Sequence, residues 1–312
     1  MPARTLLGPG AIGEIVRQVQ QTLISLGFGP PKVDGVFGEA TATAVRQFQT
    51  AKSLPVTGML DETTWQPLTN RPVPPAGERS LQLTAAFEGH GFGLAVGNFD
   101  GAFLTWGIIG FTMKSKNVQS IVSAVNNTNP ELIKQAFGEN ADELLQLMAA
   151  SVDFQKRWAD EHTVKSRALA EPWRSTFATF GSFPHVQQEQ LKHVRENYLS
   201  PAIKTAKKLG LTSELALALC FDIQVQNGGI KPATLKSLIR QSQAGTPEPE
   251  LRKLIANAAA DSARQAYRED VRARKTAIAT GEGKVHGHLY ALNNWGLSGD
   301  FAAQELSANG SP

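Results

Sequence analysis

Residues 89–112 read GHGFGLAVGNFDGAFLTWGIIGFT, and this stretch is the most informative part of the sequence about its structure. Glycines recur among aromatic and branched apolar residues, a composition that disfavours helix and predicts short strands joined by tight turns. The only acidic residue in the stretch is Asp100, within the turn NFDG. The apolar residues at positions 81–87 predict a helix that ends at Gly89 and carries Glu88 in its last turn.

A carboxyl group at a helix end and a second one in a nearby turn suit the hydrolysis of a glycosidic bond. That reaction needs one protonated carboxyl group, which donates to the leaving oxygen, and one ionised carboxylate, which activates a water in an inverting enzyme. Apolar neighbours at the helix end would raise the pKa of Glu88, whereas a turn near solvent would keep Asp100 ionised. The spacing alone leaves open an ordinary structural role for both residues.

The run DGAFLTWGIIGFT, residues 100–112, resembles the signature of the family 46 chitosanases, which belong to the lysozyme superfamily. The resemblance implies a lysozyme-like glycoside hydrolase domain. It places Asp100 as the general base, Thr105 as the hydroxyl that helps to hold the attacking water, and Glu88 as the general acid. The interval from Glu88 to Asp100 is 12 residues, which is shorter than in typical chitosanases.

A second departure from the family concerns the substrate. Typical chitosanases carry an acidic residue five positions after GFT, where it meets the ammonium group of glucosamine. Here that position is Asn117, preceded by Lys114 and Lys116. The substitution predicts a neutral or positive subsite that disfavours chitosan, a polycation, and tolerates the N-acetylated and lactyl-bearing sugars of peptidoglycan. The alternative is that the two lysines belong to an ordinary solvated face.

The rest of this domain is predicted to be mostly helical. The predicted helices span residues 131–137, 142–158, 189–209, 213–225, 232–242 and 248–275. Long helices around a small sheet agree with a lysozyme-like α+β domain. The apolar helix LALALCFDIQV leads into Gln226 and Asn227, which the resemblance places behind or beside the sugar cleft as candidates for substrate binding. A purely structural hydrogen-bonding role for both residues fits the sequence equally well.

A repeat precedes this domain. The sequence VDGVFGEAT at residues 33–41 recurs as VTGMLDETT at residues 56–64, and in each copy a glycine turn leads into a helix that begins with an acidic residue and threonine. Apolar residues at helical spacing predict three short helices around an aromatic core. The pattern resembles the peptidoglycan-binding domain of the first type over residues 12–69. The resemblance implies a module that binds the bacterial envelope, and a retained fold without binding activity is the alternative.

Residues 70–79, NRPVPPAGER, favour an extended, semi-rigid spacer between the two parts. The predicted organisation is a three-helix peptidoglycan-binding domain at residues 12–69, a Pro-rich linker at 70–79 and a lysozyme-like glycoside hydrolase domain at 80–308. The predicted fold class is therefore mainly α, with an α+β lysozyme-like catalytic domain that contains a small β-hairpin region, and a small three-helix N-terminal domain.

Composition excludes several other classes of protein. A formal net charge of +3 over 312 residues is too small to indicate nucleic-acid binding, and no apolar run is long enough to span a membrane. The single cysteine, Cys220, excludes an internal disulfide and lies in an apolar run typical of a buried thiol. We expect no metal, because His286 and His288 lack a third ligand at a convincing spacing. We also expect no cofactor, since no nucleotide-loop motif is present.

These observations predict a peptidoglycan-degrading endolysin, muramidase-like and inverting, that hydrolyses β-1,4 bonds of the glycan while its N-terminal module holds the polymer. A chitosanase- or chitinase-type glycosidase and a catalytically silent envelope-binding protein are the alternatives. Because the N-terminus lacks the apolar run of a Sec signal peptide, we expect synthesis in the cytoplasm and action in the periplasm after release by a holin or a secretion system. The expected partner is peptidoglycan, without nucleic acid or membrane insertion, and the expected state is a monomer.

Overall fold

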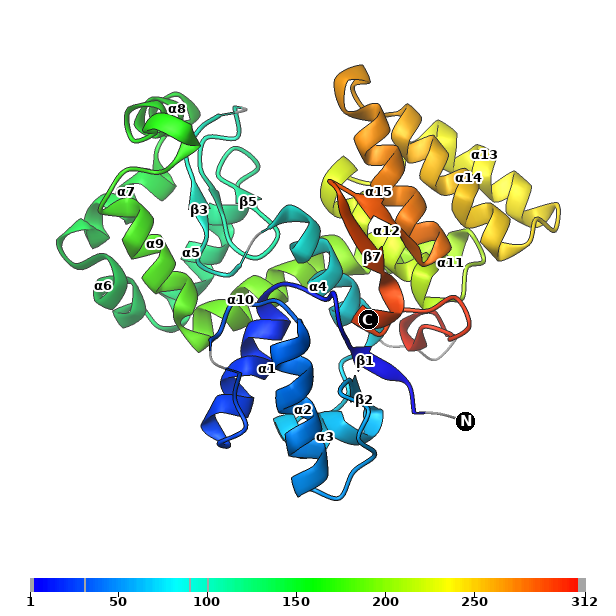
Figure 1. Ribbon diagram of the computed structural model, residues 1–312. Helices are drawn as coiled ribbons and strands as arrows, with labels where there is room; N and C mark the ends of the chain where they lie inside the picture. The colour runs from blue at the N-terminus through cyan, green and yellow to red at the C-terminus, as the bar shows by residue number, and fades with distance from the viewer. Residues whose placement is uncertain (1–2, 31, 90, 100, 308–312) are drawn as a thin grey trace. The chain divides into compact units, whose positions relative to one another are not determined.

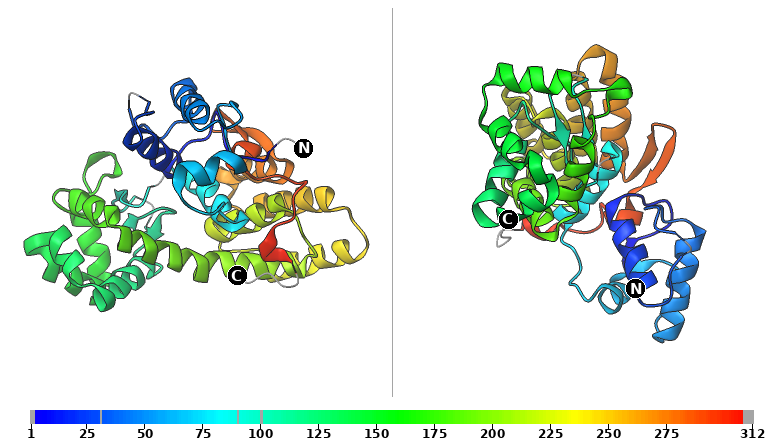
Figure 2. Two further views of the ribbon diagram at one scale, coloured as in Figure 1. Left: turned by 90° about the horizontal axis from the view of Figure 1, so that it is seen from below. Right: turned by 90° about the vertical axis from the view of Figure 1, so that its left-hand side faces the viewer.

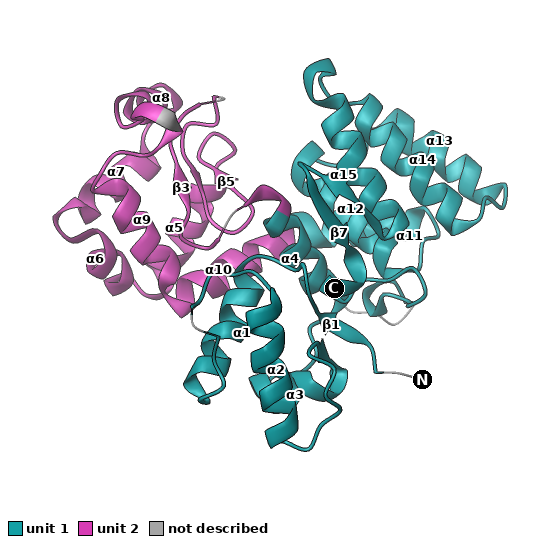
Figure 3. Cartoon of the chain, in the orientation of Figure 1, with its two compact units in different colours: residues 1–86, 197–312 teal, residues 87–196 magenta. Residues whose placement is uncertain are grey.

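The structure is a computed structural model that describes residues 3–30, 32–89, 91–99 and 101–307 (Figure 1). The chain forms two compact units (Figure 3). Unit 1 comprises Met1–Ala86 together with Asn197–Pro312, and unit 2 comprises Phe87–Glu196. Helices dominate both units and the sheets are small, which confirms the predicted fold class. None of the helices in the described ranges combines the length and apolar character needed to cross a membrane.

The N-terminal part of unit 1 is the predicted three-helix module. Its elements are β1 (Thr5–Leu7), α1 (Glu14–Ser25), α2 (Glu39–Ala51), β2 (Leu60–Asp61) and α3 (Glu62–Thr69). The strands β1 and β2 pair antiparallel, and the blue helices lie together in every view (Figure 2). Val16, Leu23, Phe48 and Trp65 of the helices are buried together with Phe37, which precedes α2, and this confirms the predicted aromatic core.

Two buried glutamines explain why the sequence of this module repeats. Gln20 accepts the N–H of Gly35 and donates to Thr41 Oγ1 at 3.0 Å. Gln49 accepts the N–H of Gly58 and donates to Thr64 Oγ1, also at 3.0 Å. Each amide therefore joins a helix to the following glycine turn and to the first turn of the next helix. A buried side-chain amide without hydrogen-bond partners destabilises the folded state. The glycine turn and the threonine are therefore both needed in each copy of the repeat.

The C-terminal part of unit 1 surrounds one apolar helix. Its elements are α11 (Ser200–Lys208), α12 (Glu214–Asn227), α13 (Pro232–Gln243), α14 (Glu248–Asp261), α15 (Arg268–Thr280), β6 (Glu282–Val285) and β7 (His288–Ala291). Consecutive residues from Glu214 to Ile223 of α12 are all buried, so this helix forms the centre of the core. The helices α14 and α15 lie side by side (Figures 1 and 2).

Contacts within unit 1 join the N-terminal segment to the C-terminal one. The carboxylate of Glu214, on α12, contacts the guanidinium groups of Arg4 and Arg79, the latter at 2.6 Å. The N–H of Gly8 donates to the carbonyl of Asn294 at 3.1 Å. Arg79 belongs to α4 (Ala76–Glu88), which begins inside the predicted spacer at residues 70–79.

Unit 2 contains a three-stranded antiparallel sheet surrounded by helices. Its elements are β3 (Ala95–Val96), β4 (Thr105–Trp106), β5 (Phe111–Thr112), α5 (Asn117–Thr128), α6 (Glu131–Phe137), α7 (Ala141–Ala149), α8 (Val152–Glu161), α9 (Trp173–Ser182) and α10 (Pro184–Val194). The strand order is β3-β4-β5, so the glycine-rich stretch folds as the short strands that its composition predicts. The aromatic core of unit 2 consists of Trp106, Phe137, Phe177 and Phe180.

Two helices that the sequence predicts as continuous are each divided into two in the structure. The predicted helix over residues 142–158 is two helices, because Ser151 adopts an extended backbone and its hydroxyl accepts the N–H of Phe154 as the N-cap of α8. The predicted helix over residues 248–275 is also two, since α14 ends at Asp261 and a short 3₁₀ turn precedes α15. In both cases the apolar periodicity continues across the break, so periodicity alone does not reveal it.

Candidate active site

The turn between β3 and β4 carries the predicted general base. Asp100 itself lies outside the residues that the structure describes, and Asn98 holds two residues that follow it. The side-chain oxygen of Asn98 accepts the N–H groups of Gly101 and Phe103, both at 3.1 Å, and its amide group donates to Asp160 at 2.6 Å. One asparagine of the predicted turn NFDG thus fixes Gly101 and Phe103, a role that sequence reasoning did not assign to it. An asparagine two residues before Asp-Gly is a typical turn signal that could have found it.

The second turn, which joins β4 to β5, is fixed by the buried Gln190 of α10. Its side-chain oxygen accepts the N–H of Ile108 at 3.1 Å, and its amide donates to the carbonyl of Phe92 at 2.9 Å. Gly107 has a φ of +88°, and a Cβ atom there would stand 2.7 Å from the same side-chain oxygen. The sequence GIIG thus reflects a left-handed backbone and a close approach that only glycine allows.

The structure places Glu88 and Thr105 where the sequence predicts them locally. Glu88 is the last residue of α4, half-buried, and Gly89 follows it with a φ of +66°. Thr105 is the first residue of β4, the central strand, and pairs with Val96 on one side and Thr112 on the other. Their catalytic roles stay predictions.

Positive charge lies beside the turn of Asp100. The ammonium group of Lys114 lies 3.8 Å from the place that a Cβ atom of Gly101 would take, and 5.9 Å from the ring centre of Phe103. Phe99 is 47% exposed, and the guanidinium of Arg167 stacks on its ring at 4.7 Å. Sequence reasoning pointed to Lys114 but missed Phe99 and Arg167, which are far apart in the chain.

Asn117, the predicted substrate-binding residue, begins α5 and is half-buried. Its side-chain oxygen lies 2.9 Å from Nε2 of His193 on α10. Burial lowers the pKa of His193 below its usual value, and the charge of Glu196 opposes this shift. The side chain at position 117 is an amide, which lacks the negative charge that an ammonium group would prefer.

In unit 1, Gln226 and Asn227 are near a buried charged cluster at the end of α12. Asp222 is wholly buried and its carboxylate contacts Arg274 at 2.6 Å and Lys275 at 2.5 Å. The ammonium of Lys275 also donates to the side-chain oxygen of Gln226 at 2.6 Å. Gln226 thus makes a hydrogen bond within the protein, which is the structural role that the sequence allowed as an alternative to substrate binding. The side-chain oxygen of Asn227 is buried and has no hydrogen-bond partner among the described residues.

Side chains that could hold a metal or act as a thiol nucleophile are poorly placed. In the described part of the chain, no three His, Cys, Asp or Glu side chains gather as a metal site. The ring of His286 is 2.6 Å from Asp270, so it pairs with a carboxylate. Burial raises the pKa of Cys220 to about 12, which keeps its thiol protonated and unreactive.

Comparison with known protein families identifies the family to which this chain belongs. The family model described as glycosyl hydrolase family 46 matches residues 90–253, more than half of the chain. The chain belongs to glycosyl hydrolase family 46. It is therefore a glycoside hydrolase, as the resemblance of the glycine-rich stretch implied. A second family model, described as a putative peptidoglycan binding domain, matches residues 12–68 and confirms the resemblance of the N-terminal repeat.

Solved structures of family 46 chitosanases are similar to this chain. A chitosanase described only as a complex is 20% identical, with a TM-score of 0.52, and the match covers 69% of this chain and 95% of that one. A mutant chitosanase of Bacillus subtilis MY002 complexed with 6 GlcN is 20% identical, and a family 46 chitosanase of Gynuella sunshinyii with chitotetraose is 19% identical. Both of these matches have a TM-score of 0.49 and cover 66% of this chain and 86% of the other. No curated protein matches the chain.

Proposed function

We propose that this family 46 enzyme hydrolyses β-1,4 bonds of an amino-sugar polysaccharide with inversion. In this proposal Glu88 donates a proton to the leaving oxygen and Asp100 takes a proton from the attacking water, which the hydroxyl of Thr105 helps to hold. The single observation that supports it is the family match over residues 90–253, which contains the turn of Asp100 and strand β4. Glu88 ends α4, the helix end at which the resemblance to the chitosanases places the general acid.

Chitosan is the substrate that family membership favours, because the signature around Asp100 resembles that of the chitosanases. A polymer of protonated glucosamine requires negative or neutral surroundings along the bound chain. Endo-cleavage of chitosan is thus the first activity to measure.

Peptidoglycan is the second candidate substrate, and a specific observation favours it. Lys114 and Arg167 bring two cationic side chains to the turn of Asp100, and Asn117 replaces the acid that meets glucosamine in typical chitosanases. Like charges repel, so these groups disfavour an ammonium-bearing sugar and tolerate an acetylated or carboxylate-bearing one. The match of residues 12–68 to a peptidoglycan-binding family supports the same substrate and a wall-binding role for the N-terminal module.

The test uses the full chain on two polymers in parallel. Reducing ends released from chitosan and from purified sacculi are measured for the wild type, Glu88→Gln, Asp100→Asn and the control Glu161→Gln, an exposed acid of α8. We expect the first two variants to lose at least about 100-fold in rate, and the control to keep the rate. Proton NMR of the first product reports inversion, and mass spectrometry of sacculus digests identifies the bond that is cut.

Each outcome decides one point. Wild-type rates for both Glu88→Gln and Asp100→Asn would refute the two-carboxylate assignment. Release from chitosan alone supports the first substrate, and release from sacculi alone supports the second. A wild-type protein that releases reducing ends from neither polymer contradicts both substrates.

A further inference from the structure

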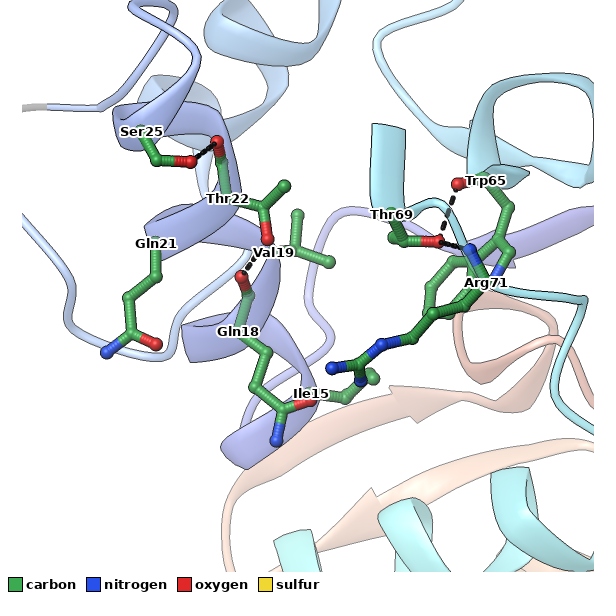
Figure 4. Close-up of a pocket in the computed structure, with 9 residues that line it drawn as sticks. All are labelled: Ile15, Gln18, Val19, Gln21, Thr22, Ser25, Trp65, Thr69 and Arg71. Carbon is green, nitrogen blue, oxygen red and sulfur yellow. Dashed lines mark hydrogen bonds between the residues drawn. The ribbon is translucent and has the colours of Figure 1, made fainter. Parts of the chain in front are cut away.

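The N-terminal module contains a pocket of about 350 Å³ between α1 and α3 (Figure 4). Residues of α1 form one wall, among them Gln18 and Gln21, and Thr69 and Arg71 form the other. The side chain of Arg71 points across the pocket toward the wall that carries Gln18. The pocket thus brings the guanidinium of Arg71 opposite the side chain of Gln18, on the module that matches a putative peptidoglycan-binding family.

The hydroxyl groups of this pocket restrict the chemistry of its ligand. Thr22 donates to the carbonyl of Gln18 at 2.9 Å, Ser25 donates to the carbonyl of Thr22 at 2.8 Å, and Thr69 donates to the carbonyl of Trp65 at 2.8 Å. Their protons are used within their own helices, so their oxygens can only accept from a ligand. The cationic donor that faces the pocket is therefore the guanidinium of Arg71.

The charge of the pocket favours an anionic group. Arg71 is the only charged side chain among its lining residues, and it is exposed. The carboxyl group of Glu14 lies one helical turn before Gln18 and is not part of the lining. Glu14 instead interacts with Gln18 and with the charge of Arg17. A carboxylate in the pocket would meet a guanidinium, which is the side chain best suited to bind it.

The pocket offers no aromatic face on which a sugar ring could stack. Trp65 is the only aromatic residue in its lining, and it is 4% exposed. Its indole nitrogen donates to the carbonyl of Pro72 at 2.9 Å, so the ring is fixed inside the module. An extended peptide, with N–H groups and a carboxylate, fits hydroxyl acceptors and one guanidinium better than a glycan does.

We propose that this pocket binds the stem peptide of peptidoglycan, with a peptide carboxylate on Arg71. The inference rests on the wall-binding role proposed above for the N-terminal module, and it names the part of the polymer that the module recognises. The module thus binds the cross-linking peptides, while the catalytic domain acts on the glycan. Chitosan, which carries no peptide, has no ligand for the pocket.

Co-sedimentation of the full chain with purified sacculi tests the proposal. The Glu88→Gln background is used so that the polymer stays intact during the measurement. Two polymers are compared, namely intact sacculi and sacculi whose peptides have been removed by an N-acetylmuramoyl-L-alanine amidase. We expect binding to intact sacculi and at least about tenfold weaker binding to stripped ones, because a charge-assisted pair is lost.

Variants of the pocket give the second arm of the test. Arg71→Ala is expected to weaken binding to intact sacculi about tenfold, Gln21→Glu to weaken it through repulsion, and Arg71→Lys to keep part of it. The control is Arg46→Ala on α2, a half-buried arginine that pairs with Glu39 and does not line the pocket, and it should bind like the parent. Circular dichroism checks that each variant is folded.

The results separate this inference from the catalytic proposal. Equal binding of the parent to intact and stripped sacculi would show that the glycan is the ligand and would overturn the inference. Unchanged binding of both Arg71→Ala and Gln21→Glu to intact sacculi would exclude this pocket. Release of reducing ends by the wild type is measured independently, so the failure of either proposal is recognised without the other.

Discussion

Removal of the carboxylate of Asp222 should be among the most destabilising single substitutions in this chain. Asp222 is wholly buried, and it accepts from Thr84 at 2.9 Å, from Arg274 at 2.6 Å and from Lys275 at 2.5 Å. Arg274 is 2% exposed and Lys275 is wholly buried, so Asp222→Ala removes a carboxylate that two buried cations contact. Removing one partner of a buried ion pair costs about 3–5 kcal/mol. For a chain of this size we expect a fall in Tm of roughly 6–10 °C.

The same carboxylate predicts how stability depends on pH. Burial opposes ionisation of Asp222, yet the charges of Arg274 and Lys275 hold its pKa well below its usual value. A carboxyl group whose pKa is depressed by folding stabilises the protein above its unfolded pKa, near 4, and loses that contribution as the pH falls toward the folded value. The Tm difference between the wild type and Asp222→Asn should therefore be largest at neutral pH and shrink below pH 4.

Differential scanning fluorimetry between pH 2 and pH 8 measures both effects. The control is Glu131→Ala, which removes an exposed ion pair with Lys134 and should change stability by less than about 1 kcal/mol. A Tm of Asp222→Ala within about 2 °C of the wild type at pH 7 would refute the reasoning. A difference between the wild type and Asp222→Asn that stays constant from pH 8 to pH 2 would contradict the assigned ionisation state.

Three further predictions concern the candidate active site. Gln190→Leu leaves the carbonyl of Phe92 and the N–H of Ile108 buried without partners, and it should cost about 2–4 kcal/mol in urea unfolding. Asn98→Ala releases the turn of Asp100, so activity should fall about 10–100-fold while Tm changes by only a few degrees. Lys114→Glu reverses a charge beside that turn and should raise the ratio of chitosan to peptidoglycan cleavage roughly tenfold. An unchanged free energy of unfolding would contradict the prediction for Gln190→Leu, and an unchanged rate would contradict the one for Asn98→Ala. An unchanged ratio of the two activities would contradict the prediction for Lys114→Glu.

Local signals in the sequence predicted the elements that depend on local geometry. Gly89 ends α4 with a left-handed backbone, and Gly107 takes the same region in the turn that Gln190 holds. These positions were predictable because glycine has a physical reason to stand there. The break at Ser151 was not, since a serine at an N-cap and a serine inside a helix look alike when the apolar stripe continues through both.

Partners that are distant in the sequence limited the prediction of the site. Asn98 contacts Asp160, and the ring of Phe99 contacts Arg167, across more than 60 residues of chain. A turn signal shows that Asn98 closes a turn, but nothing near it in the sequence indicates which carboxylate fixes the turn in place. The family signature indicated Glu88, which spacing alone could not have separated from an ordinary helix-end residue.

The Pro-rich spacer shows how long-range contacts change the meaning of a local signal. Prolines 72, 74 and 75 predict an extended connection, and α4 does begin directly after them, at Ala76. Yet Arg79, in the first turns of α4, shares the buried carboxylate of Glu214 with Arg4, which precedes the N-terminal module. Both ends of the module are thus joined to one side chain of α12. Within unit 1 these buried ion pairs hold the module at both ends, so the prolines there do not act as a freely flexible tether.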